Sequence, residues 1–199
     1  KVAYTNPCVN WIVKIHPANI VKNMRDGVGS EPSELTAIRS LGESPPPHVR
    51  IIQPDSRLST LSLYSVMDYC VTVRGTVGIE AASVGIPVLR PGTGRYDGLG
   101  VTVDSESRSQ YLDRLAHIQD LPSLTARERE LAERLAYGVF IARPLTLRTV
   151  ALEYQRDAKA SLQTRVCLPK GQELHAAADL RALAAWIQSG QEDFLSPHA

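Results

Sequence analysis

Two turns of small residues follow two apolar runs near the middle of the chain, and their composition suits the binding of a phosphate. Gly75-Thr76 lies between the apolar run Cys70–Val73 and a predicted helix, Val77–Val84. Thr93-Gly94-Arg95 follows a second apolar run, Pro87–Leu89. Backbone N–H groups at a helix N-terminus are unpaired and lie at the positive end of the helix dipole, so a turn that leads into a helix can bind an anion. The pattern therefore predicts an anion site formed by the two turns.

Side chains near these turns add further candidate contacts. Glu80, one turn into the helix, could reach a ribose or sugar hydroxyl, although the helix dipole alone also favours an acid in a first turn. Arg95 could neutralise a phosphate or bind an acidic sugar, and Asp97 could bind a hydroxyl; both could equally be solvated loop charges. No general base or nucleophile is identified. The candidate nucleotide-binding residues of this region are Gly75, Thr76, Val77, Glu80, Thr93, Gly94 and Arg95.

A histidine at the end of another apolar run is the third part of the candidate site. The run Trp11–Ile15 predicts a strand, and His16-Pro17 ends it, because proline cannot continue a central strand and holds the preceding residue extended. An imidazole at the carboxyl end of a strand can donate a hydrogen bond to a phosphate. It can equally be an exposed residue at a strand end, and on the residues alone both roles for His16 stay open.

Strands and helices are predicted to alternate along the first part of the chain. The alternation indicates an α/β fold with a Rossmann-like parallel sheet and flanking helices, followed by a helical tail. Ligands of such sheets bind at the carboxyl ends of the strands. The glycines after Leu89 lack the third glycine of a dinucleotide fingerprint, which argues against an NAD-linked oxidoreductase. The expected strands are Trp11–Ile15, Val49–Ile52, Cys70–Val73, Pro87–Leu89 and Val101–Val103.

Two domains are expected, with a boundary near Pro122. Residues 1–122 form the α/β domain, and residues 123–199 form a C-terminal helical extension that packs on it. Helices are predicted over Thr125–Ile141 and Ala178–Ile187, and Leu145–Tyr154 could be helical or extended. Ser123 or Thr125 could form a loose capping box with Glu128.

Charge and composition argue against several classes of protein. A formal net charge of +1 at pH 7 gives no global field that would attract nucleic acid. Cys8, Cys70 and Cys167 have neither metal-ligand nor disulfide-framework spacing, and they fit a reducing cytosol. We expect no secretory signal, no membrane-spanning segment, no metal and no cofactor.

Four short motifs follow one another along residues 11–137. They are Lys14-Ile15-His16-Pro17, Gly75-Thr76-Val77-Gly78-Ile79-Glu80-Ala81, Gly85-Ile86-Pro87-Val88 and Tyr96-Asp97-Gly98-Leu99-Gly100. Their order and spacing resemble the C-terminal domain of the bacterial capsule polysaccharide synthesis family. Relatives often have serine where this chain has Gly75, so the phosphate contact would fall to backbone N–H groups and Thr76.

The resemblance implies one half of a GT-B glycosyltransferase that makes capsular or other surface polysaccharide. The donor would be a CMP- or UDP-activated sugar, since some members transfer Kdo from CMP-Kdo, and the histidine that matches His16 contacts the donor phosphate in the family. The acceptor would be a glycan or glycolipid. The enzyme would work in the cytoplasm, at the inner face of the cell membrane, with peripheral membrane association. Because a complete enzyme has two Rossmann-like domains, we interpret the chain as a fragment that lacks its N-terminal domain and is inactive alone.

Other interpretations remain open. A polyol-phosphate transferase or a UDP-sugar 2-epimerase shares this half of the fold, but a polyol-phosphate transferase should carry further His or Arg residues in the loops. A non-catalytic interaction domain could have kept the fold for docking. Failure to bind any nucleotide would favour that last class.

Overall fold

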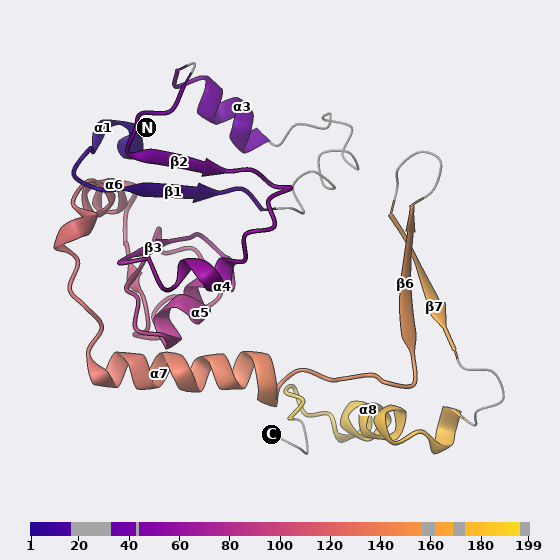
Figure 1. Cartoon of the computed structure of the whole chain (residues 1–199). Coiled ribbons are helices and arrows are strands. Elements are labelled where there is room, and N and C mark those ends of the chain that lie inside the picture. The colour runs from indigo at the N-terminus through magenta and orange to yellow at the C-terminus, as the bar shows by residue number, and fades with distance from the viewer. Residues whose placement is uncertain (17–32, 43, 157–161, 169–173, 196–199) are drawn as a thin grey trace. The chain divides into compact units, whose positions relative to one another are not determined.

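The computed structural model describes residues 1–16, 33–42, 44–156, 162–168 and 174–195, which divide into two compact units (Figure 1). Among these residues the first unit ends at Ala136 and the second begins at Tyr137. Helix α7 (Ala126–Tyr137), which the sequence analysis placed in the extension, therefore groups with the first unit. Its Ala132 is fully buried, and the side chain of Arg129 lies against Gly85. These contacts explain why the division lies beyond Pro122.

Among the described residues of the first unit, five parallel strands make two small sheets. In one sheet β1 pairs with β2, and in the other β4 lies between β3 and β5. Each predicted strand overlaps an observed one, the last at Val103 alone, and all these pairs are parallel, which confirms an α/β fold with parallel strands. The strands are β1 (Trp11–Lys14), β2 (Val49–Ile52), β3 (Cys70–Val71), β4 (Val88–Arg90) and β5 (Val103–Asp104).

Short helices connect these strands. Helix α5 lies between β3 and β4 in the chain and contacts both of them, and α6 contacts β4. In the part of the chain that is described, no helix combines the length and the apolar character needed to cross a bilayer. Within the described residues, the helices before α7 and the 3₁₀ turn are α1 (Val2–Thr5), α3 (Ser33–Arg39), α4 (Thr60–Leu63), α5 (Val77–Ser83), α6 (Arg108–Ala116) and η1 (Ile118–Asp120).

Strand β4 is the centre of the buried core. Val88, Leu89 and Arg90 have no solvent exposure. A strand covered on both faces must be apolar along its length, as Val88 and Leu89 are. Ala81 and Ala82 of α5 are also fully buried, because their small side chains let the helix approach the strand closely. Arg90 is the exception to this apolar core.

The second unit departs from the predicted helical extension, because it contains an antiparallel hairpin whose first strand begins within Leu145–Tyr154, the segment left open as helical or extended. Strand β6 (Ala151–Arg156) pairs with β7 (Leu162–Cys167) over six positions. Glu153 lies opposite Arg165, and opposite charges at paired positions favour strands. The predicted helix near the C-terminus is present as α8. The remaining elements are the π-helical turn η2 (Gly138–Ala142), the 3₁₀ turn η3 (Leu174–Ala176) and α8 (Ala178–Ser189).

The predicted capping box at the start of α7 is confirmed. The N–H of Glu128 donates to Oγ1 of Thr125 at 3.2 Å, and Oε2 of Glu128 accepts from the N–H of Thr125 at 2.8 Å. The Thr125 hydroxyl also donates to Oε2 of Glu128 at 2.7 Å. The hydrogen bonds from the Thr125 side chain and backbone lower the pKa of the Glu128 carboxyl.

Thr125→Ala should lower the free energy of unfolding by about 1 kcal/mol, because helix N–H groups lose their side-chain acceptor. Thr125→Ser should keep most of that stability. Since the pKa of Glu128 is lowered in the folded state, its contribution is present above the unfolded pKa and is lost as pH falls through the folded pKa. Urea unfolding should therefore show a smaller difference between wild type and Thr125→Ala at about pH 3 than at about pH 7. Equal differences at both values would contradict this role for Glu128.

Candidate functional site

The β3 turn, which comprises residues 72–76, exposes the backbone that leads into α5. The N–H of Gly78 donates to the Gly75 carbonyl at 3.2 Å, and the N–H of Ile79 donates to the Thr76 carbonyl at 2.9 Å. Thr76 occupies the N-cap position, yet its hydroxyl makes no capping hydrogen bond within the described part of the molecule. Gly75 and Thr76 are exposed, and Val77 is half-buried. The turn thus exposes an N-cap residue whose hydroxyl makes no capping bond, while the N–H groups of Gly78 and Ile79 are already paired with carbonyls of the turn.

The β4 loop, which comprises residues 91–97, carries the second set of predicted contacts. Gly92 has a φ of 78°, and a Cβ there would overlap the carbonyl oxygen of Ser105, so the position requires glycine. Thr93 and Arg95 are exposed. The N–H of Gly94 donates to the carboxylate of Asp97, so this amide is already used within the loop.

The β3 turn and the β4 loop are in direct contact. Nε of Arg74 donates to the carbonyl oxygen of Thr93 at 3.2 Å. A Cβ on Gly94 would lie 2.9 Å from the carbonyl oxygen of Val73. The structure therefore brings together predicted residues from two separate loops, at the carboxyl ends of β3 and β4.

Two predicted residues lie apart from this contact. His16 is exposed and lies two residues beyond β1, in the other sheet. Glu80 is half-buried, and its Oε2 accepts a hydrogen bond from the hydroxyl of Tyr64 on α4 at 2.9 Å. Burial and this hydrogen bond raise the pKa of Tyr64, and burial together with the Glu80 charge raises the pKa of Cys70 to about 11. Glu80 thus has a partner within the fold.

Arg90, which was not among the predicted site residues, contacts both the β3 turn and the β4 loop. Its guanidinium is fully buried and donates from Nη2 to the Val73 carbonyl at 2.7 Å. The guanidinium carbon lies 3.7 Å from the ring centroid of Tyr96, and Nη1 pairs with Oδ1 of Asp97 at 2.5 Å. An arginine that ends an apolar run, followed by an aromatic and an acidic residue in the next loop, was the only signal in the sequence.

Two exposed cations lie beside the β3 turn and the β4 loop. Between residues 72 and 98 the charged side chains are three arginines and two acids. Asp97 pairs with the buried Arg90, and Glu80 accepts from Tyr64. Arg74 and Arg95 are exposed beside the turn and the loop. An anion that approaches the turn and the loop therefore meets these two guanidiniums, while Asp104 lies beside Arg90 at the end of β5.

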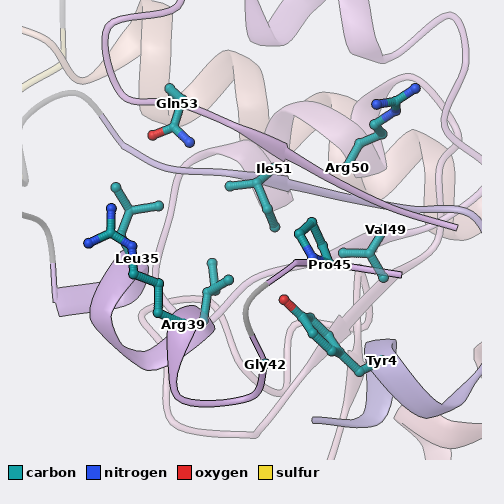
Figure 2. A pocket seen from close by; sticks show the side chains of 10 residues that line it. Tyr4, Leu35, Arg39, Gly42, Pro45, Val49, Arg50, Ile51 and Gln53 are labelled. Atoms are coloured by element: carbon teal, nitrogen blue, oxygen red, sulfur yellow. The ribbon is translucent and has the colours of Figure 1, made fainter. Parts of the chain in front are cut away.

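A hollow lies elsewhere in the first unit. It has a volume of about 350 Å³ and is bordered by residues of α1, α3 and β2. Figure 2 shows Leu35, Ile51 and Tyr4 around it, and no residue of the β3 turn or the β4 loop is among its lining residues. The candidate site is therefore an open surface between two loops, distinct from this hollow.

Neither metal chemistry nor similarity to known proteins assigns a role to this surface. No three His, Cys, Asp or Glu residues within the described ranges are grouped to hold a metal ion. Comparisons with protein-family models, curated proteins and solved structures find no match.

Gly94→Ala should disturb the β4 loop, because the added Cβ would overlap Nη2 of the buried Arg90. Overpacking of this kind costs about 1–3 kcal/mol. Gly138→Ala is the matched control, since a Cβ at Gly138 meets nothing within 4 Å. Chemical denaturation should show a clear loss for Gly94→Ala and little change for Gly138→Ala. Equal stabilities of the two variants would contradict the close approach of Gly94 to Arg90.

Proposed function

We propose that the first unit is the donor-binding half of a GT-B glycosyltransferase that makes capsular or other surface polysaccharide. The donor is a CMP- or UDP-activated sugar whose phosphate binds between the β3 turn and the β4 loop. The observation that carries the proposal is the direct contact of these segments through Arg74 and Thr93 at the ends of neighbouring parallel strands. Open α/β sheets bind their ligands at this edge.

We also infer that the two small sheets belong to one Rossmann-like sheet with the order β2-β1-β3-β4-β5. The parallel pairing within each sheet supports this. A helix also lies between successive strands in the chain: α3 follows β1, α4 follows β2 and α5 follows β3. Crossovers between parallel strands are nearly always right-handed, and this strand order is a common outcome of such connections. In this arrangement His16, at the carboxyl end of β1, faces the same edge and supplies a third phosphate contact.

The chemistry of this edge is the stabilisation of negative charge. Its donors are the Arg74 and Arg95 guanidiniums and the Thr76 and Thr93 hydroxyls. As the bond from sugar to phosphate breaks, the leaving nucleotide gains charge, and donors already placed around it lower the barrier. We assign the catalytic base and the binding site for the glycan or glycolipid acceptor to a further domain. The whole enzyme acts at the cytoplasmic face of the membrane. This chain alone therefore binds donor without turnover.

Calorimetric titration of the full chain with CMP, UDP, CDP and GDP tests the proposal. We expect saturable binding of CMP or UDP. Arg74→Ala should weaken it about tenfold, since a charge-assisted hydrogen bond of about 1.4 kcal/mol corresponds to that factor. His16→Ala should also weaken binding.

Arg127→Ala is the matched control for charge. Arg127 is an exposed arginine on α7 that pairs with Glu130, so its removal changes the net charge equally but lies on another element. Its affinity should equal that of wild type. Absence of binding by every nucleotide, or equal losses in Arg74→Ala and Arg127→Ala, would refute the donor site and favour a non-catalytic interaction domain.

A further inference from the structure

We propose that Arg90 is a positioning residue that holds the β3 turn and the β4 loop in one arrangement and thereby sets the affinity of the donor site. The inference rests on the proposed function and adds the residue that organises the site. Arg90 itself does not reach the surface, because its side chain has no solvent exposure. It acts through the groups that surround its guanidinium.

The guanidinium meets both segments directly. Nη2 donates to the carbonyl oxygen of Val73, within the β3 turn, at 2.7 Å. On the other side the guanidinium carbon lies 3.7 Å from the Tyr96 ring centroid, and Nη1 lies 2.5 Å from Oδ1 of Asp97, both in the β4 loop. Gly94 passes so close that a Cβ would overlap Nη2. One buried cation thus lies between the two segments that would bind phosphate.

Two partners of Arg90 extend its influence to the predicted ligand positions. The Tyr96 hydroxyl donates to the Gly75 carbonyl at 2.7 Å, which links the β4 loop to the residue before the N-cap of α5. The second carboxylate oxygen of Asp97 accepts from the N–H of Gly94. Tyr96 alone connects Arg90 to Gly75, and Asp97 alone connects Arg90 to Gly94. The positions of Gly75 and Gly94 are therefore coupled through the Arg90 guanidinium.

An arginine at this position is not needed for burial. Val88 and Leu89 of the same strand are apolar and fully buried, so the core accepts apolar side chains there. Apolar replacements of a buried ion pair are often neutral or stabilising. Within the described residues, Nε and Nη1 of Arg90 lack a well-aligned hydrogen bond although Nη1 is paired by charge with Asp97. The Arg90 charge therefore contributes more to the conformation of the loops than to the free energy of unfolding.

The test uses the double variant Arg90→Met/Asp97→Asn, which removes both charges and leaves an amide oxygen to accept from Gly94. Its urea midpoint should stay close to that of wild type, while its affinity for UDP and CMP falls at least tenfold. Backbone ¹⁵N relaxation without nucleotide should show order parameters falling from about 0.85 to below about 0.6 in residues 72–76 and 91–97 only.

Tyr96→Phe is the second variant, because it keeps the ring beside the guanidinium and removes only the hydrogen bond to Gly75. Its order parameters should fall in the β3 turn and stay unchanged in the β4 loop, with a roughly threefold to tenfold loss of affinity, as expected for one hydrogen bond.

Three results would overturn the inference. In the first, the double variant would keep both loops ordered, and in the second it would keep wild-type affinity. In the third, it would lose order throughout β4 and α5, which would mark Arg90 as a general core residue. If wild type binds no nucleotide, the donor site fails and the claimed effect on affinity fails with it. The relaxation measurement then still reports separately whether Arg90 orders the two loops.

Discussion

The guanidinium of Arg90 lies at the carboxyl end of the central strand β4, and its charge must be met by protein groups because no solvent reaches it. The packing around this guanidinium explains the residue types found at several neighbouring positions. Gly94 has no side chain because the guanidinium occupies that space, and Gly78 has none because a Cβ would overlap the Tyr96 hydroxyl. Asp97 supplies the counter-charge. A single buried cation thus determines which residue types the surrounding turns can accept.

This constraint also decides the charge that a ligand would meet. Both acids of the predicted site, Glu80 and Asp97, are engaged by Tyr64 and Arg90 within the protein. The exposed charges beside the turn and the loop are those of Arg74 and Arg95. We therefore favour recognition of a phosphate over recognition of sugar hydroxyls by carboxylates, and the proposed role of Glu80 shifts toward support of the turn through α4.

The sequence predicted the strands well because a buried strand must be apolar and each run ends at a turn residue. It also located the β3 turn and the β4 loop, since their glycines and threonines mark backbone that approaches other atoms. Arg90 was missed because its partners Val73 and Asp97 are neighbours in space, and periodicity reports only local pattern. The hairpin of the second unit was missed for a related reason: the cross-strand pairing of Glu153 with Arg165 is not a helix-or-strand signal in either segment alone.

Mapping of amide chemical shifts during titration with UDP and CMP tests the central claim most directly, because it locates the bound phosphate along the chain. The account predicts that the largest changes fall on Gly75, Thr76 and Thr93, with smaller changes near His16. Changes gathered instead around the hollow between α3 and β2, or no saturable change at all, would contradict a phosphate site at the ends of β3 and β4.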